Sequence, residues 1–383
     1  MQTLSEWTHD WIKKVLPNTQ AISLALLLAL GFGLVIGLGK MLMPVFAAGV
    51  IAYLLEGIVK AGERRKLPRL AAVLVVYLLF LAFVLFLLVA LLPLLYQQSM
   101  QFITQLPAWA NSAQTLIMEL PQRYPGFITE TQLVEITATM RKDLLSWGQS
   151  MLTYSYSSLV SIITLTVYLI LMPFLVFFFL KDKERILAWF IQYLPRDRHL
   201  SGKVWDEVDM QIGNYVRGKF IEVLALLIAS LATFALMGLN YPLLLAVLIG
   251  LSAIIPYVGA TLVTFPVVIV AFFQWGMGDE FWYLILAYSI IQALDAVVLI
   301  PLLFSEVVNL HPVAIIVAIL FFGGIWGFWG VFFAIPLATL VKAVLNAWPR
   351  LGEEEDAGTA TASPEIPAAM LKGPDAWVGR QRH

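Results

Sequence analysis

Two apolar segments in the C-terminal half of the chain resemble each other, and both are interrupted by glycine and proline. An offset of 70 positions places Pro242 on Pro312 and aligns a second proline in each segment. Turn-forming residues lie between the paired prolines, at 256–259 in the first segment and 323–327 in the second. Paired, interrupted apolar segments are typical of carriers whose site lies near the middle of the membrane. The pattern therefore favours movement across a membrane over chemistry on a soluble substrate.

The composition also indicates a membrane protein. Of the 383 residues, 60% are hydrophobic and 13% are charged, and the mean hydropathy is +0.85. Soluble domains carry about 25% charged residues, so this chain has too few to cover a water-exposed surface. A formal net charge of -1 gives no reason to expect a nucleic-acid partner. The chain has no cysteine, which excludes disulfides and thiolate chemistry.

Further apolar runs are long enough to cross a bilayer. A hydrocarbon core about 30 Å thick requires roughly 20 helical residues. The runs that meet this requirement are 21–38, 42–59, 70–95, 159–180, 220–239 and 281–304. With the two repeated segments, they predict an all-α polytopic membrane protein with about eight membrane segments.

Lysine and arginine predict the orientation of these segments. Basic residues cluster in two short connections, 60–69 and 181–203, and such clusters face the cytoplasm. The turn at 238–241 carries no charge and is expected outside. This alternation places both termini in the cytoplasm.

The predicted spans divide the chain into successive regions. The regions are 1–95, with an N-terminal amphipathic helix and three spans; 96–158, an extracytoplasmic helical module; 159–219, the fourth span and a cytoplasmic amphipathic connector; 220–348, the repeat-containing transport core; and 349–383, a disordered cytoplasmic tail. Within the module, apolar residues recur at helical spacing from Leu133 to Met151. That face either packs on its own neighbours or the membrane surface, which is favoured, or forms a seam between subunits.

The first repeated segment is expected to be a hairpin. As one straight helix, Leu243–Phe273 would measure about 46 Å, well beyond the bilayer core. Pro256 lacks a backbone donor and disfavours helix at the preceding residue, and Gly259 permits a sharp turn. A single kinked and tilted helix is the alternative. If both segments are hairpins, the first opens outward, the second opens inward, and the two halves form an inverted repeat.

Few ionisable residues lie within the apolar segments. Asp295 lies near the middle of 281–304, and Gln292 precedes it on the same helical face. A carboxylate at this depth usually marks an ion or proton path, with a structural carboxylate paired across helices as the alternative. Glu222 follows Lys219 by three residues near the inner surface, where an ion pair or snorkelling explains it. These residues are the candidates for ion binding.

The hairpin tips complete the predicted site. Gly259 and Gly324 are expected to pack closely or to carry positive φ, and Pro256 lies beside the first of them. Trp326 belongs to an aromatic and glycine-rich stretch that either packs between helices or lines a cavity. The sequence contains no nucleotide-binding loop, catalytic motif or metal-ligand motif, so neither an enzyme nor a bound cofactor or metal is expected. Coupling to protons or sodium ions is the expected energy source.

A series of short motifs follows in order along the chain. They are Phe177–Asp182, Asn214–Lys219, Ile255–Gly259, Gln292–Asp295, Asn309–Pro312, Gly327–Gly330 and Ala334–Pro336. As a set they resemble the autoinducer-2 exporter-like (AI-2E) family of bacterial membrane proteins, from the first span to Trp348. The resemblance implies a multi-pass protein of the bacterial inner membrane. It also implies activities proposed for the family, namely export of autoinducer-2 and cation/proton antiport.

The sequence thus predicts a secondary transporter that exports a small molecule or exchanges cations for protons by alternating access. An oligomeric channel and a non-transporting membrane scaffold are the alternatives. The expected partners are the lipid bilayer, the transported small molecule or ion, and further copies of this chain, without nucleic acid.

Overall fold

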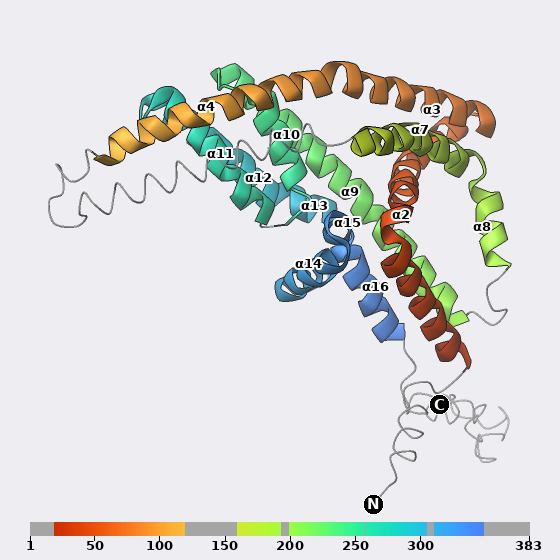
Figure 1. Ribbon diagram of the computed structural model, residues 1–383. Helices are drawn as coiled ribbons and strands as arrows, with labels where there is room; N and C mark the ends of the chain where they lie inside the picture. Colours follow the sequence, from red (N-terminus) through yellow and green to blue (C-terminus); the bar gives the residue numbers. More distant parts are fainter. Residues whose placement is uncertain (1–18, 119–158, 193–198, 257, 305–309, 348–383) are drawn as a thin grey trace, which may run out of the picture.

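The computed structural model describes residues 19–118, 159–192, 199–256, 258–304 and 310–347, and the regular elements in these ranges are all helical (Figure 1). The α-helices are α2 (Thr19–Arg64), α3 (Arg69–Phe86), α4 (Leu92–Met118), α7 (Leu159–Lys181), α8 (Lys183–Ile191), α9 (His199–Met237), α10 (Pro242–Ser252), α11 (Val258–Trp275), α12 (Asp279–Leu294), α13 (Ile300–Phe304), α14 (Pro312–Trp326), α15 (Phe328–Phe332) and α16 (Ala334–Ala347). Two π-helical turns, η1 (Leu87–Leu91) and η2 (Asp295–Leu299), join α3 to α4 and α12 to α13.

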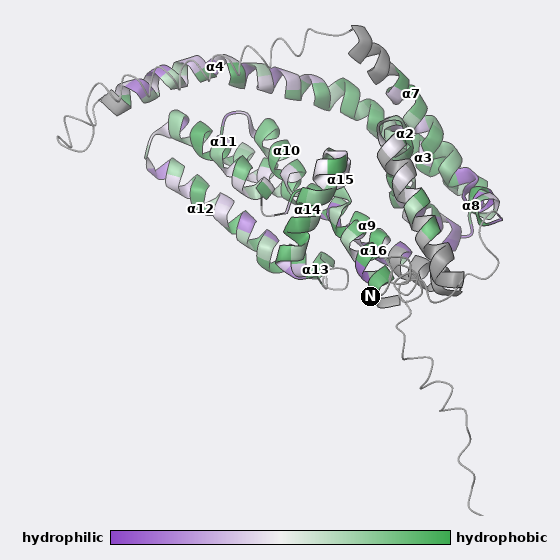
Figure 2. Cartoon of the chain, turned by 60° about the horizontal axis from the view of Figure 1, so that its bottom comes forward, coloured by the Kyte–Doolittle hydropathy of each residue, from purple (hydrophilic) through white to green (hydrophobic). Residues whose placement is uncertain are grey.

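Length and apolar character fit these helices to a membrane. In the described ranges, five helical stretches are long and apolar enough to cross it: Met41–Arg64, Arg69–Leu116, Asp209–Met237, Val258–Trp275 and Asp279–Phe304. Shorter apolar helices accompany them, among them α10 and α14. In Figure 2 most of the length of these helices is coloured hydrophobic, as expected for helices surrounded by lipid. The prediction of an all-α, multi-pass membrane protein is confirmed.

Helices α2, α3 and α7 form one packed group. Small and β-branched side chains, including Ala48, Ala52, Val73 and Val176, are buried between them. Figure 1 shows α3 and α4 as one long curved helix that runs from this group to α10 and α11. Near the start of α4, Gln98 accepts a hydrogen bond from the backbone N–H of Leu244 at 2.9 Å. The curved helix therefore connects the two ends of the structure.

The N-terminal spans differ from the expectation. Residues 21–38 and 42–59 were predicted as two spans, but both belong to the single helix α2. The three residues between them, Gly39 to Met41, keep helical geometry instead of turning. A Cβ added to Gly39 would lie 3.4 Å from Nε1 of Trp326, so this part of α2 packs against the C-terminal half of the chain. Local sequence cannot reveal such a contact.

Two other expected boundaries lie inside helices. Helix α9 continues from the predicted cytoplasmic connector through the predicted span at 220–239, and it ends at Met237. The helix that contains α3 and α4 passes position 95 without a break and reaches Met118. The amphipathic repeat from Leu133 to Met151 and the C-terminal tail lie outside the described residues.

The first repeated segment forms a hairpin. Helices α10 and α11 pack against each other, and the tip between them includes residues 253–256. At the open end, Gln274 accepts a hydrogen bond from the N–H of Asn240 and donates one to the carbonyl of Gly238, each at 2.8 Å. The end of α11 therefore returns to the start of α10. The hairpin prediction is confirmed over the single kinked helix.

Gly259 allows the close approach at this tip. It is buried in the first turn of α11, and a Cβ added there would collide with the carbonyl oxygen of Ser252, at the end of α10. Pro256 lies in the non-helical connection, where its missing N–H breaks no helical hydrogen bond.

The second repeated segment also folds back on itself. Ala318 and Phe322 of α14 pack with Ala334 of α16, and the short α15 lies between the two helices. The reversal occurs at Gly327, which has φ +59°. Gly324 remains within α14, and a Cβ added there would meet no atom within 4 Å. The expectation that Gly324 packs closely or has positive φ is therefore wrong, because the turn lies three residues later.

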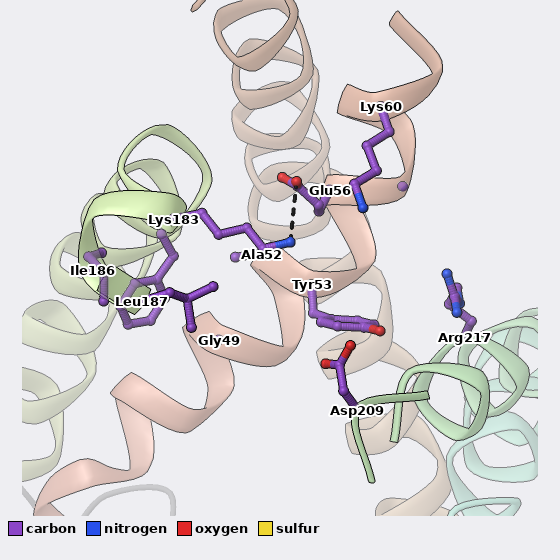
Figure 3. A pocket seen from close by; sticks show the side chains of 12 residues that line it. Gly49, Ala52, Tyr53, Glu56, Lys60, Lys183, Ile186, Leu187, Asp209 and Arg217 are labelled. Carbon is purple, nitrogen blue, oxygen red and sulfur yellow. Dashed lines mark hydrogen bonds and ion pairs between the residues drawn. The ribbon is translucent and has the colours of Figure 1, made fainter. Parts of the chain in front are cut away.

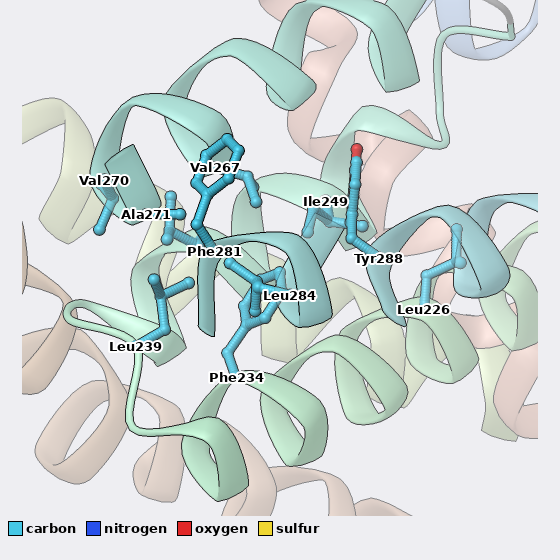
Figure 4. Close-up of a cluster of buried hydrophobic side chains, with 11 residues drawn as sticks. Leu226, Phe234, Leu239, Ile249, Val267, Val270, Ala271, Phe281, Leu284 and Tyr288 are labelled. Atoms are coloured by element: carbon cyan, nitrogen blue, oxygen red, sulfur yellow. The ribbon is translucent and has the colours of Figure 1, made fainter. Parts of the chain in front are cut away.

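The two hairpins begin at opposite ends of α9. The open end of the first lies beside Phe234 and Leu239, in the hydrophobic core shared by α9, α10, α11 and α12 (Figure 4). Helix α12 and its continuation to α13 then run back along α9, so that Phe304 packs on Tyr215. The second hairpin starts there, with Ile315 in the same cluster. This arrangement agrees with the predicted inverted repeat.

Candidate functional site

A cavity of about 350 Å³ lies between α9, the tip of the first hairpin, η2 with α13, and the start of the second hairpin. Its polar lining consists of Tyr215, Lys219, Glu222 and Asp295, together with backbone groups of the tip. Its other walls are mostly apolar and include Ile255, Pro256, Phe304, Pro312 and Ile335. An apolar cavity with a few converging polar groups is the usual form of a small-ligand site.

Lys219 occupies the centre of this polar group. Its ammonium nitrogen lies 2.7 Å from Oε2 of Glu222 and donates a hydrogen bond to the carbonyl of Ala253 at 2.8 Å. It also lies 5.1 Å from the centre of the Phe304 ring. Ala253 follows the last turn of α10, where free carbonyl groups carry partial negative charge. Lys219 therefore neutralises both a carboxylate and a helix end.

Glu222 is more enclosed than its sequence position indicated. The predicted ion pair with Lys219 is present, and the two side chains are only 5% and 3% exposed. The alternative explanation, snorkelling of Glu222 to water, is wrong, because α9 continues without a break and α10 covers this part of it. Lys219 and Glu222 thus form a buried ion pair, in which loss of either charge would leave the other uncompensated.

Asp295 has a different environment. Its side chain is buried, with 9% of the residue exposed, and Oδ1 has no hydrogen-bond partner among the described residues. Asp295 is the first residue of the π-helical turn η2, and such turns occur frequently at functional sites. The turn adds one residue to the helical repeat and so shifts the face on which the following residues lie. Nothing in the sequence indicated this turn.

The structure brings together only some of the predicted site residues. Asp295, Glu222 and Pro256 line the cavity, and the buried Gly259 lies directly behind the tip. Gln292, one turn before Asp295, is half-buried and does not line it. Gly324 and Trp326 do not line it either; Trp326 lies against Gly39 of α2 instead. The contact with Gly39 agrees with the packing interpretation of Trp326.

Two lining residues were not among the sequence candidates. Lys219 appeared only as a partner of Glu222, although a lysine within an apolar helix is itself an unusual feature. Tyr215 is 1% exposed, and its buried hydroxyl group has no hydrogen-bond partner within the described ranges. Tyr215 precedes Lys219 by four residues, so both lie on one face of α9. This spacing could have identified Tyr215 as a site residue from the sequence.

The charges of this site do not balance when all groups are ionised. Two carboxylates, Glu222 and Asp295, face one cation, Lys219. An uncompensated carboxylate in an apolar environment is strongly unfavourable, so one proton or one monovalent cation is needed to neutralise the site. The site as described thus lacks one positive charge for neutrality when both carboxylates are ionised.

Comparison with known proteins agrees with this architecture. The family model described as "AI-2E family transporter" matches residues 10–350. PerM of Escherichia coli K12, which is named as a permease, is 45% identical to this chain over 344 residues, which cover 90% of this chain and 98% of PerM. YueF of Bacillus subtilis 168, named as a transport protein, is 26% identical over 89% of this chain and 93% of its own length. Because the family match covers nearly the whole chain, this multi-pass membrane protein belongs to the AI-2E family of transporters.

Proposed function

We propose that this protein is a secondary transporter that moves a small molecule or an ion by alternating access, with the two hairpins framing the site. One observation carries the proposal: the tip of a broken helical hairpin meets a buried carboxylate and a buried ion pair in one cavity. Non-helical backbone within a membrane is tolerated where it borders protein or a cavity, and carriers use such tips to contact their substrates. Membership of a transporter family supports the same conclusion.

The coupling step is assigned to Asp295. When Asp295 binds a proton or a cation, the site becomes neutral and Lys219 is held by Glu222 and Ala253 alone. When that charge leaves, Lys219 has two carboxylates to stabilise, and its hydrogen bond to the tip weakens. The position of the first hairpin would then depend on the charge state of Asp295. Such a dependence is what links an ion gradient to a conformational change.

The cavity restricts the size of the cargo. A volume of about 350 Å³ is at the lower end of the range for small-molecule sites, which is about 300–1,000 Å³. This size supports an ion or a molecule of few heavy atoms. We propose export of a small polar molecule of the autoinducer-2 type, or cation/proton antiport, coupled to protons or sodium ions.

The proposed setting is the bacterial inner membrane, with both termini in the cytoplasm and with copies of the chain assembled as a homo-oligomer. The basic residues in the connections 60–69 and 181–203 support a cytoplasmic location for these connections and for the helix ends that they join.

A flux screen in proteoliposomes tests the proposal. An imposed proton or sodium gradient should drive accumulation of autoinducer-2, or an added cation should evoke proton movement that an internal pH dye reports. Labelled cargo should also exchange for unlabelled cargo in the absence of a gradient. Equilibration without counterflow would indicate a channel instead, and an absence of any flux across the panel would indicate a scaffold.

A further inference from the structure

A second cavity, of about 430 Å³, lies between α2, α8 and the part of α9 from Asp209 to Arg217 (Figure 3). It shares no lining residue with the cavity at Asp295. Its polar walls come from Tyr53, Glu56 and Lys60 of α2, Lys183 of α8, and Asp209 with Arg217 of α9. The proposed transport mechanism leaves these residues without a role.

The cavity lies at the level where the apolar helices end. Lys60 is one turn from the end of α2 at Arg64, and Lys183 opens α8 directly after α7. Asp209 lies in the polar part of α9, eleven residues before the apolar run that begins at Phe220. Beyond the cavity, α8 exposes large hydrophobic side chains, with Trp189 53% and Phe190 58% exposed. Aromatic residues of this kind mark the interface between hydrocarbon and headgroups, so the cavity faces the headgroup layer.

The charges that line the cavity favour an anionic group. Lys60, Lys183 and Arg217 provide three positive charges, against two negative charges from Glu56 and Asp209. Lys60 has no ion-pair partner in the described part of the chain, and Figure 3 shows its ammonium group pointing into the cavity, above the ring of Tyr53. The guanidinium group of Arg217 lies 5.8 Å from the centre of that ring, and Figure 3 shows it beside the ring. Lys60 and Arg217 are thus placed to hold a phosphate between them.

Glu56, in contrast to the basic residues, requires a hydrogen-bond donor from a ligand. It is 6% exposed, and its Oε1 lies 3.4 Å from Nζ of Lys183 and 3.7 Å from a guanidinium nitrogen of Arg69. Its second oxygen, Oε2, is buried and has no hydrogen-bond donor within the described residues. A buried acceptor without a donor is costly, typically by about 1–3 kcal/mol. The cavity therefore combines a position for a phosphate with an acceptor that lacks its donor.

We propose that this cavity binds the headgroup of a membrane phospholipid, with the phosphate between Lys60 and Arg217 and a headgroup hydroxyl or ammonium donating to Glu56. The apolar side chains of Phe179, Ile186 and Leu187 line the same cavity and would contact the first part of an acyl chain. These apolar contacts, and the level of the cavity in the membrane, favour a lipid over a free phosphate ion. Basic pockets between membrane helices on the cytoplasmic side are known to accept lipid headgroups in this way.

Lipid titration with native mass spectrometry tests the proposal on the purified full-length protein. The probe is dioleoyl phosphatidylglycerol, whose headgroup carries hydroxyl donors. Lys60→Gln/Arg217→Gln should lower its affinity by roughly tenfold to thirtyfold, since each basic contact to an anionic lipid contributes about a fivefold change. The matched control Arg65→Gln/Arg185→Gln removes two exposed basic residues that do not line the cavity, and it should retain wild-type affinity. Lys60→Gln alone, at an exposed position, should fold normally and lose about fivefold.

Two further arms identify the ligand. Dioleoyl phosphatidylcholine has the same chains and phosphate but no headgroup donor, so it should bind at least several-fold more weakly than phosphatidylglycerol. Inorganic phosphate at millimolar concentration should not displace the lipid. Equal losses in the test and control variants, equal affinity for both lipids, or displacement by inorganic phosphate would each overturn the proposed lipid site.

Discussion

The ammonium nitrogen of Lys219 lies 2.8 Å from the carbonyl oxygen of Ala253, the residue at which the first arm of the hairpin ends. The two residues are 34 positions apart in the sequence. Because Lys219 also pairs with Glu222, one buried cation joins α9 to the hairpin tip. In the proposed mechanism, the charge of the neighbouring Asp295 determines how firmly Lys219 holds that tip.

Removal of this cation should destabilise the protein. We expect Lys219→Met to lower the free energy of unfolding by roughly 3–5 kcal/mol, because Glu222 would remain buried without its partner. The measurement is the thermal unfolding midpoint of purified protein in detergent. Lys219→Met/Glu222→Leu should recover a large part of the loss, since replacement of both charges by apolar groups is often neutral. An unchanged midpoint in Lys219→Met would show that the pair contributes little to stability.

Gly259 and Gly324, which the sequence predicts at equivalent hairpin tips, should respond differently to substitution by alanine. Gly259→Ala should destabilise the protein by about 1–3 kcal/mol and lower transport per molecule, because the new methyl group collides with backbone at Ser252. Gly324→Ala is the matched control and should be neutral or slightly stabilising, since space is open there and alanine favours helix. Flux and thermal unfolding measured on both variants make the comparison. Equal effects at the two positions would contradict the described geometry of the first tip.

The hairpin also makes a prediction about topology. Single cysteines replacing Asn240 and Met277 should both react with an impermeant thiol reagent in intact cells, because Gln274 binds the backbone at Gly238 and Asn240. A cysteine replacing the exposed Arg185 should react only after the membrane is permeabilised. The absence of native cysteine keeps the background low. Reaction of 240 and 277 from opposite sides would rule out the hairpin.

Much of the architecture could be predicted because its determinants are local. The length of the apolar runs identifies the spans. Pro256 and Gly259 identify the first tip, because the missing backbone donor of proline and the missing Cβ of glycine affect the backbone in any tertiary context. Asp295 could be found for a similar reason, because a carboxylate within an apolar run is unfavourable in any arrangement.

The remaining features depend on contacts between distant segments. Helix α2 continues through Gly39, where its backbone packs on Trp326, and no local pattern records that contact. The second turn lies at Gly327 and not at Gly324, although both glycines have the same intrinsic freedom, because Gly330 packs against the backbone of Phe322. The role of Lys219 likewise requires the tip to approach α9.

Gradient-driven transport by Asp295→Asn is the most direct test of the proposed coupling. Asparagine keeps the shape of the side chain but cannot bind and release a proton. The measurement is accumulation in proteoliposomes of the cargo identified by the flux screen, under an imposed proton gradient and across a series of pH values. Asp279→Asn is the matched control, because it makes the same change at an exposed position on the same helical segment. We predict that Asp295→Asn remains folded and loses uphill accumulation, while Asp279→Asn behaves as wild type. Uphill transport by Asp295→Asn at the wild-type rate and with unchanged pH dependence would contradict the assignment of coupling to Asp295.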